Sequence, residues 1–347
     1  MSTDRPDQFP EPLEVQPDAP FAEAGPVWGV PPPPRFQHRY GKHVVLLVLT
    51  LLTTTTAGAC HQLGFDLSMG TMPQPDVTTF EQLFGLLLQR LPGGLTYAVP
   101  LLVILGAHEF GHYAYCRVYQ VDATLPYFLP FLIPLPIPVQ FGTVGAVIRI
   151  KEAFPSKRAL FDIGVAGPIA GFVALLPFLW WGITLSGVVK FPETGDGVIY
   201  FGEPLLLKAV AWLHFGDLPD GFDIVLHPMG FAAWFGMLAT ALNLLPFGQL
   251  DGGHIAYAVF GRRAAAISAL TLVTAVLLFT FESSSWFFVA LMMVAMAFLL
   301  GLRHPRIIDE DTPLDGRRRA VALLALAMLI ICFTPVPIEL FLEGPAQ

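Results

Sequence analysis

Seven apolar runs set the strongest limit on how this chain can fold. They lie at residues 44–60, 95–116, 159–183, 228–247, 264–281, 285–302 and 320–338. A helix needs about 20 largely apolar residues to cross the hydrocarbon core of a bilayer, and each run comes close to that length. Only 13% of the residues are charged, which is about half the share in a soluble protein. The sequence therefore predicts an all-α polytopic membrane protein with about seven transmembrane helices.

The positions of lysine and arginine predict how these spans are oriented. Loops on the cytoplasmic side of a membrane are enriched in both residues. With a cytoplasmic N-terminus, 16 of the 19 lysines and arginines fall on the inner side, and only Arg90, Lys190 and Lys208 fall outside. Seven spans then place the C-terminus outside. We expect an integral, multi-pass protein of a bacterial inner (cell) membrane, with the lipid bilayer as its partner and no nucleic-acid-binding face.

Residues 126–148 are as apolar as a span but contain five prolines, at positions 126, 130, 134, 136 and 138. Such a segment cannot form an unbroken helix. Both of its flanks fall on the inner side, so the segment is expected to enter the membrane layer and return. Non-helical backbone at that depth must be buried in protein or line a wet cavity. The sequence therefore predicts a proline-rich, re-entrant, non-helical hairpin.

The second apolar run carries the ionisable sequence HEFGH at 108–112. His108 and His112 are four residues apart, so on a helix they share one face and both imidazoles can reach one ion. Glu109 can reach a water on that ion and act as a general base. This HExxH spacing is typical of zinc hydrolases. It predicts Zn²⁺ as the cofactor, the two histidines as ligands and Glu109 as the catalytic base.

The same side chains have an alternative interpretation, because ionisable residues within spans also form proton relays and cation sites in transporters. Inserting a carboxylate into hydrocarbon costs on the order of 3 kcal/mol on insertion scales, so a compensating partner is needed, and a zinc ion supplies one. The alternative function is a non-proteolytic ion or proton carrier, or a metal-binding membrane scaffold.

A third metal ligand is expected, because catalytic zinc usually has three protein ligands and one open position. The fourth apolar run ends in the sequence ALNLLPFGQLDGGH, at 241–254. The charge distribution places Asp251 at the inner end of this run, at the depth of the HEFGH motif. Pro246 and the following glycines break the helix, so that Asp251 can face inward as a ligand.

Other residues near these motifs have open or structural interpretations. Asn243 can offer its amide to a peptide carbonyl or an oxyanion, or it can form an interhelical hydrogen bond. We expect His254 to lie at the membrane interface, and Cys116, one turn beyond His112, to be structural rather than a fourth ligand. The glycines at 164, 167 and 171 have the spacing of close helix packing.

These motifs together resemble the site-2 protease family of intramembrane zinc metalloproteases. HEFGH, the proline-rich hairpin, FDIGVAGPIAG at 161–171 and NLLPFGQLDGG occur in that family's order over about residues 95–260. The resemblance implies zinc bound by His108, His112 and Asp251, with Glu109 as the base. It also implies that Asn243 and the hairpin hold an extended substrate strand. The expected substrate-binding and oxyanion positions are Asn243 and Pro246.

The resemblance also implies a substrate class and partners. The expected activity is a zinc metalloendopeptidase that hydrolyses peptide bonds in or near the transmembrane segments of single-span, membrane-anchored regulatory proteins. An upstream protease of the site-1 type would make an earlier cut. The loop at about 186–226 is too short for the PDZ domain that many bacterial members carry, so the chain resembles the branch without one.

The expected domain organisation has three parts. Residues 1–42 hold a disproportionate share of the prolines, lack an apolar period, and are expected to form a disordered cytoplasmic tail. Residues 43–302 form the membrane-embedded metalloprotease domain, with its catalytic core at about 95–260. Residues 303–347 form a cytoplasmic linker and one additional C-terminal transmembrane helix.

Overall fold

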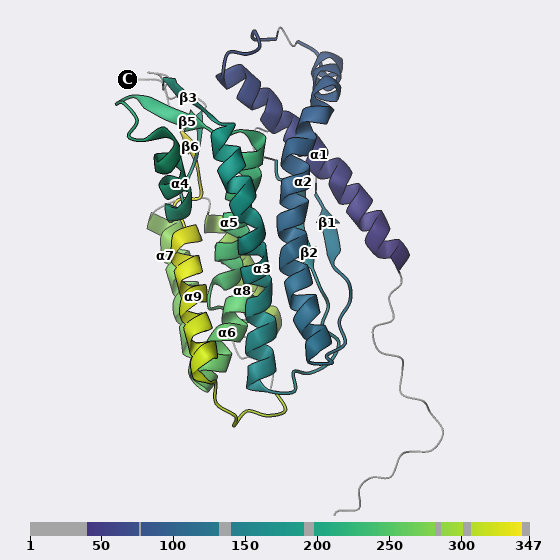
Figure 1. Cartoon of the computed structure of the whole chain (residues 1–347), viewed down its shortest axis with the longest axis vertical. Helices are drawn as coiled ribbons and strands as arrows, with labels where there is room; N and C mark the ends of the chain where they lie inside the picture. The colour runs from purple at the N-terminus through teal and green to yellow at the C-terminus, as the bar shows by residue number, and fades with distance from the viewer. Residues whose placement is uncertain are drawn as a thin grey trace, which may run out of the picture. The chain divides into compact units, whose positions relative to one another are not determined.

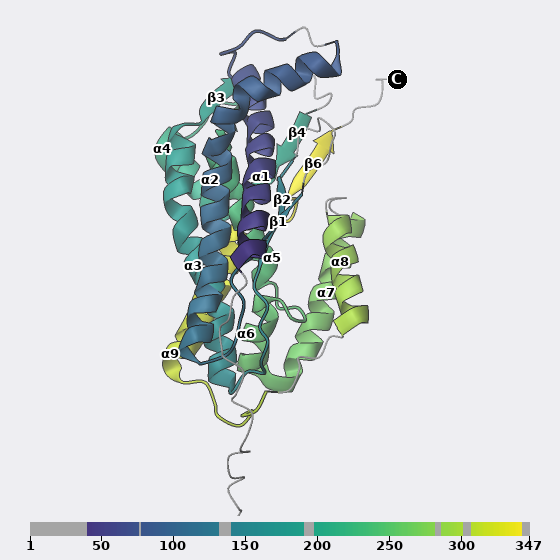
Figure 2. The same ribbon diagram turned by 90° about the vertical axis from the view of Figure 1, so that its right-hand side faces the viewer.

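The computed structural model of the protein describes residues 40–75, 78–131, 140–190, 198–281, 286–300 and 307–341. All of them belong to one compact unit, His38–Gln347, shown in Figures 1 and 2. The helices are α1 (Tyr40–Ser68), α2 (Phe80–Val118), α3 (Lys157–Thr184), α4 (Leu205–Phe215), α5 (Pro228–Leu244), α6 (Asp251–Phe260), α7 (Ala264–Phe281), α8 (Trp286–Leu300) and α9 (Gly316–Cys332), with a 3-10 turn at Gly261–Arg263. Residues 1–39 of the predicted tail lie outside the described ranges.

Four helical stretches among the described residues are long and apolar enough to cross a membrane. They are α1, α2 from Glu81 onward, α3, and the stretch Asp251–Phe281 that joins α6 to α7. Helices α4 and α5 and the segment Val289–Phe298 of α8 are apolar but shorter. These helices identify a largely helical, multi-pass membrane protein; the count of seven spans remains a prediction.

The outer faces of the helices suit a lipid environment. Large apolar side chains are exposed along α1, α3, α7 and α9, including Leu52, Val173, Leu270 and Leu323. Soluble monomers rarely expose contiguous apolar surface on this scale. These faces therefore support burial of the helices in a bilayer, including α9, which is shorter than the four long stretches.

Helix α2 begins well before the expected start of its span at residue 95. Thr79 accepts a hydrogen bond from the N–H of Gln82, at 3.3 Å, and the Gln82 side chain accepts one from the N–H of Thr79, at 3.2 Å. This reciprocal pair is a capping box, which satisfies backbone N–H groups that a helix leaves open at its first turn. The T-x-x-Q spacing was a signal for this start, and the expected span was too short.

The structure also contains strands, so the all-α class was too narrow. Among the described residues they form three antiparallel pairs: β1 (Tyr127–Pro130) with β2 (Thr143–Val147), β3 (Gly187–Lys190) with β5 (Phe222–Val225), and β4 (Val198–Phe201) with β6 (Ile338–Phe341). The last two pairs join segments that are distant in sequence, and these segments are too short for strand periodicity to identify them.

Strands β1 and β2 are the described parts of the predicted hairpin, whose residues 132–139 lie outside the described ranges. The register shifts between Leu129 and Pro130, which leaves Val144 as an extra, exposed residue on β2. The hairpin rests on α1: a ring nitrogen of His43 lies 3.0 Å from the Pro126 carbonyl oxygen, and the Thr53 hydroxyl donates to the Gly142 carbonyl at 2.6 Å. The described flanks are thus non-helical, as predicted.

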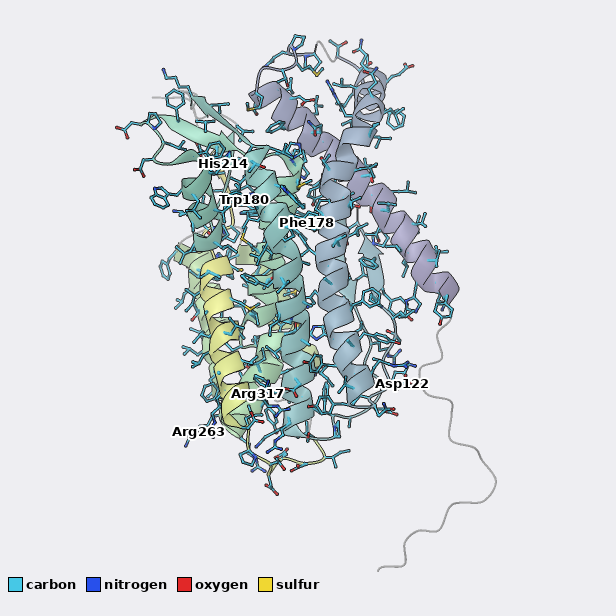
Figure 3. All side chains as sticks on the ribbon, viewed as in Figure 1. Asp122, Phe178, Trp180, His214, Arg263 and Arg317 are labelled. Carbon is cyan, nitrogen blue, oxygen red and sulfur yellow. The ribbon has the colours of Figure 1, made fainter. Side chains whose placement is uncertain are left out.

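The helices have two chemically different ends. Asp122, Arg263 and Arg317 lie at one end, whereas Phe178, Trp180 and His214 lie toward the other (Figure 3). We call the first the arginine end. The segments that follow α2 and α6 lie at this end, as does the start of α9. All three belong to loops predicted to lie on the inner side.

Helices α1 and α2 approach closely through glycine. A Cβ atom on Gly94 would lie 2.1 Å from the carbonyl oxygen of Thr55 and 2.8 Å from the backbone nitrogen of Ala59. Real Cβ atoms do not tolerate backbone at such distances. The contact therefore depends on the missing side chain, as in small-residue interfaces between membrane helices.

Replacing Gly94 by alanine should lower the free energy of unfolding by about 1–3 kcal/mol, because the two backbones must separate. Thermal or denaturant unfolding of the protein in detergent measures this loss. Gly85→Ala is the matched control, since a Cβ at Gly85 meets nothing within 4 Å and alanine favours a helix by roughly 0.5–1 kcal/mol over glycine. Equal stability of the two variants would contradict the assigned helix contact.

Candidate metal centre

Helix α2 carries both histidines of HEFGH on one face. His108 and His112 are each buried, and their Nε2 atoms lie 3.2 Å apart. One helical turn separates the two residues, and a continuous α-helix brings side chains at this spacing together. The structure therefore places two imidazole nitrogens at one point inside the bundle.

Asp251, the first residue of α6, completes the group. Its Oδ2 atom lies 3.1 Å from His108 Nε2 and 3.3 Å from His112 Nε2. Two ligand atoms that bind one zinc ion at 2.0–2.1 Å in tetrahedral geometry are separated by about 3.3 Å. The three donors thus fit a single tetrahedral zinc ion, with a fourth position open for water or substrate.

A break between α5 and α6 places Asp251 at this point. Helix α5 ends at Leu244, and the chain turns through Pro246 and Gly248, whose φ of +51° favours glycine. A Cβ on Gly253 would lie 2.3 Å from the Gly248 carbonyl oxygen, so the turn folds tightly back on α6. The helix break predicted from proline and glycine is present, and it aims the carboxylate inward.

Helix α3 orients the ring of His112 through the ring nitrogen that does not face the metal position. Its Nδ1 lies 2.7 Å from the carbonyl oxygen of Ile163. A carbonyl only accepts hydrogen bonds, so Nδ1 carries the proton and donates it, which leaves the Nε2 lone pair directed at the metal position. A partner of this kind fixes both the tautomer and the ring plane. No sequence pattern indicates this contact, because its acceptor is a backbone carbonyl.

Glycines of α3 make room for the metal-binding side chains. A Cβ on Gly167 would lie 2.1 Å from His112 Nε2, and one on Gly171 would lie 3.1 Å from His108 Cβ. A Cβ on Gly164 would lie 3.1 Å from His254 Cβ. The spacing of these glycines predicts close helix packing; Gly167 and Gly171 do pack closely, but against the side chains of His112 and His108. Their spacing alone does not distinguish the two cases.

Asn243 lies at the edge of the centre. Its Nδ2 is 3.5 Å from His108 Nε2, which is the outer limit of a hydrogen bond. The amide therefore lies beside the metal position rather than in a distant helix contact. Pro246 lies in the turn before Asp251, and its carbonyl accepts a hydrogen bond from Thr271 of α7 at 3.3 Å.

Glu109 is buried next to the two histidines. Its carboxylate is hydrogen-bonded by the backbone of Ile148, directly after β2. The hairpin and the proposed base are therefore in contact. This places a carboxylate, a strand edge and the metal position within one small region.

Other candidates from the sequence lie elsewhere. Cys116 is buried in a separate apolar cluster with Val121, Ala123 and Ile163, and the metal-type group among the described residues comprises His108, His112 and Asp251 without it. The ring of His254 packs edge-on against Phe154, with centroids 5.7 Å apart. Neither residue contributes a metal ligand.

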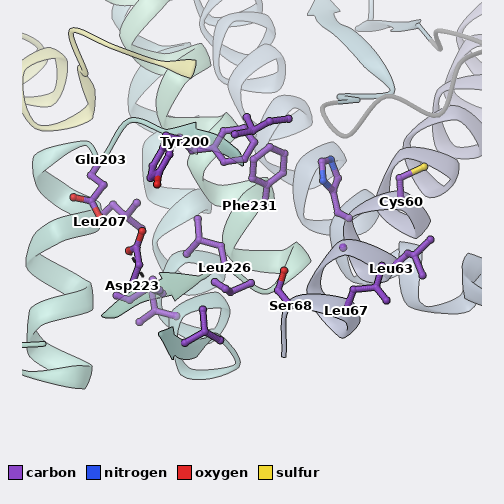
Figure 4. A pocket seen from close by; sticks show the side chains of 18 of the residues that line it. Cys60, Leu63, Leu67, Ser68, Tyr200, Glu203, Leu207, Asp223, Leu226 and Phe231 are labelled. Carbon is purple, nitrogen blue, oxygen red and sulfur yellow. Dashed lines mark hydrogen bonds between the residues drawn. The ribbon is translucent and has the colours of Figure 1, made fainter. Parts of the chain in front are cut away.

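A cavity of about 980 Å³ lies apart from the metal centre (Figure 4). Cys60, Leu63, Leu67 and Ser68 of α1 line one side, and residues of β4, α4 and β5 line the other. None of the metal-binding residues contributes to its lining. Its volume therefore says nothing about the hydrolytic chemistry.

Fold and site define a class: a largely helical membrane protein with a buried His–His–Asp group suited to zinc and a carboxylate beside it. Comparison with known proteins gives the family. Residues 96–281 match the model of Peptidase family M50, and the chain belongs to this family, the site-2 protease family.

The chain is similar to several plant proteins. An Arabidopsis thaliana protein described as "Probable zinc metalloprotease EGY2, chloroplastic" is 30% identical over 257 residues, which are 72% of this chain and 43% of that protein. An Oryza sativa subsp. indica protein with the same description is 33% identical over 191 residues, 53% of this chain and 33% of the relative. Arabidopsis "Probable zinc metalloprotease EGY1, chloroplastic" is 28% identical over 323 residues, 86% and 54% of the two chains.

The chain thus spans between a third and about half of the length of these relatives. No solved structure matches it.

Substituting Gly167 by alanine should weaken zinc binding by about 10- to 100-fold, the range for changes just outside the ligands themselves. The reason is that the new methyl group occupies the space of the His112 ring. Competition with a chromophoric chelator measures the dissociation constant. Gly106→Ala, two residues before His108, serves as control because its Cβ makes only an ordinary 3.5 Å contact with Phe128. Unchanged zinc affinity in Gly167→Ala would show that α3 does not shape the centre.

Proposed function

We propose that the protein is a zinc metalloendopeptidase that cleaves membrane-anchored proteins in or near their transmembrane segments. The observation that carries this proposal is the convergence of the ligand atoms of His108, His112 and Asp251 at 3.1–3.3 Å, with Glu109 buried beside them. Membership of peptidase family M50 supports it.

The groups of the centre have separate roles in hydrolysis. Zinc, when bound, lowers the pKa of its water toward about 7 and polarises the scissile carbonyl. Glu109 takes a proton from the attacking water and delivers it to the departing amine nitrogen. Asn243, beside His108, donates its amide N–H to the carbonyl oxygen as negative charge develops there.

The hairpin offers a place for the substrate backbone. Within the described residues β2 pairs only with β1, and we infer that its other edge receives a substrate strand; Val144 and Val147 of β2 are exposed. A helical substrate hides its carbonyls in its own hydrogen bonds, and an open strand edge supplies replacements when that helix unwinds. The backbone of Ile148 contacts Glu109, so a strand added to β2 would pass close to the base.

The arrangement of charges supports a cytoplasmic N-terminus and seven spans. Arg263 and Arg317 lie at one end of the helices (Figure 3). His112 precedes the end of α2 by about 10 Å and Asp251 precedes the end of α6 by about 14 Å, at 1.5 Å per residue. The centre then lies near the inner side of the bilayer, where water enters from the cytoplasm. Together with the four long helical stretches, α5, α8 and α9 make up the seven proposed spans.

Location and partners are part of the proposal. The relatives' descriptions place those plant proteins in the chloroplast; a bacterial cell membrane for this chain remains a prediction. Single-span regulatory proteins that have been cut once by an upstream protease are the proposed substrates. The chain resembles family members that lack a PDZ domain. The hairpin and the helix surfaces are therefore the proposed sites that select substrates.

Glu109→Gln should abolish proteolysis, with a loss of at least about 100-fold in rate, because the amide cannot accept the proton. Zinc content should remain at the wild-type level, since the three ligands are unchanged. Cleavage of a single-span reporter in proteoliposomes and metal analysis of the purified protein measure both. Glu81→Gln, an exposed glutamate in the first turn of α2, is the matched control and should cleave normally.

A carrier would give a different result. Neither the wild type nor Glu109→Gln would cut the reporter, and Glu109→Gln would instead reduce ion or proton flux across the liposome membrane. That outcome would replace the endopeptidase by the alternative function.

The strand-addition proposal predicts a specific crosslink. In a Glu109→Gln background with the native cysteines replaced, a cysteine at Val147 should form a disulfide with a single cysteine placed near the cleavage site of the reporter. Gel mobility under non-reducing conditions detects it. A cysteine at Val173, on the exposed outer face of α3, is the control. Crosslinking of equal strength at both positions would refute binding along β2.

A further inference from the structure

One segment outside the family-matched residues 96–281 contacts α3, α6 and the residue that ends α2. It comprises the linker that precedes α9 and the first turn of that helix, Ile307–Arg318, and it lies at the end of the molecule where α2 ends and α3 begins (Figure 1). We propose that this segment, here called the clamp, fixes the geometry of the metal ligands, with Arg318 and Asp162 as positioning residues. This inference rests on the metal centre and not on the substrate class.

The clamp is joined by backbone hydrogen bonds to the chain that begins α3. The N–H of Ile308 donates to the Phe154 carbonyl at 3.2 Å, and the N–H of Asp309 donates to the Pro155 carbonyl at 3.1 Å. In return, the N–H of Lys157 donates to the Asp309 carbonyl at 3.2 Å. The clamp and the start of α3 are therefore joined by backbone hydrogen bonds in both directions, as two paired strands are.

A polar cluster continues this attachment across three helices. The Arg318 guanidinium forms a two-pronged contact with the Asp162 carboxylate, with Nε donating to Oδ1 at 2.9 Å and Nη2 donating to Oδ2 at 2.5 Å. The Tyr119 hydroxyl donates to the same carboxylate and accepts from Arg318 at 3.2 Å. Asp315 also pairs with Arg318. A fork that matches a carboxylate in this way fixes direction as well as distance.

This cluster adjoins the contact that orients a metal ligand. Asp162 precedes Ile163, whose carbonyl accepts the Nδ1 hydrogen of His112 at 2.7 Å. Tyr119 directly follows the last residue of α2, about two helical turns beyond His112. Arg318 thus ties together the two chain segments that meet at the His112–Ile163 hydrogen bond. Loss of the fork would let α3 shift relative to α2 and change the angle of the ring.

The clamp reaches the third ligand through α6. The Tyr257 hydroxyl donates to Glu310 at 3.0 Å, and Ile307 and Leu314 are buried in the same apolar cluster as Ile255 and Tyr257. Asp251 begins this short helix, so its position follows that of Tyr257. The clamp therefore contacts α3, α6 and the residue that ends α2.

The charges of the clamp persist at neutral pH. Hydrogen bonds from Thr312 lower the pKa of Asp309, and the N–H of Arg318 lowers that of Asp315. A carboxyl whose pKa falls on folding contributes stability above its ordinary pKa of about 3.9 and loses it as the pH drops through the lowered value. The ionic contacts are therefore intact where the protein works.

The test compares Arg318→Gln with Arg319→Gln in the full chain, purified in detergent. Arg319 is exposed in the same turn of α9, so the two variants lose the same charge. Chelator competition gives the zinc dissociation constant. The visible absorption of the cobalt-substituted protein reports ligand geometry, and thermal unfolding is recorded with and without zinc.

Arg318→Gln should weaken zinc binding about tenfold, at the lower end of the range for supporting partners, and should alter the cobalt spectrum. Arg319→Gln should match the wild type. Arg318→Lys keeps the charge but loses the fork, so its zinc affinity should be intermediate. Tyr119→Phe, a milder change in the same cluster, should weaken binding in the same direction and supplies a result if Arg318→Gln does not fold.

A zinc dissociation constant within twofold of the wild type in Arg318→Gln and Tyr119→Phe would overturn the proposal. So would an equal loss of thermal stability with and without zinc, together with an unchanged cobalt spectrum, because the cluster would then hold only the helices. Failure of the proposed function is a separate result: the wild type would bind zinc through His112 but would not cleave the single-span reporter.

Discussion

Charged groups buried in an apolar bundle must compensate one another, and the rest of this structure depends on that requirement. Two imidazoles and two carboxylates are held within a membrane-type helix bundle, and each would be costly there alone. Their ligand atoms meet at separations that one zinc ion spans. The break between α5 and α6, the bare surface of α3 at Gly167 and the carbonyl of Ile163 all serve this single convergence. Removing any one of them leaves a buried polar or charged group without its partner.

The sequence predicted the local part of the site well. His108 and His112 are fixed relative to each other by one helical turn, and a helix keeps that spacing regardless of what surrounds it. Asp251 was predicted as the third member of the group from the charge distribution and from the helix break that proline and glycine cause, and its carboxylate lies beside both histidines. The non-helical flanks of the hairpin followed from its prolines. Each of these inferences depends on chain-local chemistry.

The other features of the site and the fold depend on contacts between residues that are distant in sequence. Gly167 has the same sequence spacing whether it faces a helix or an imidazole, so its role depends on which side chain lies opposite. The Ile163 carbonyl is invisible in sequence because every residue has one. Strands β3 to β6 pair across long stretches of chain, and each has only four residues. The clamp joins residues about 150 positions apart, as in Arg158 and Pro313, which no periodicity encodes.

The bare position on α3 has a consequence for recognising such proteins from sequence. A histidine pair four residues apart is a hypothesis for a metal site and needs its structural context; a residue without a side chain on the facing helix leaves room for the imidazole. In this chain that residue is Gly167, where a Cβ would lie 2.1 Å from a ligand nitrogen. A useful signature therefore has three parts: the paired histidines, the distant aspartate, and an obligatory void between them. Searches of uncharacterised genomes that demand all three would discard the helices whose histidines merely fill space.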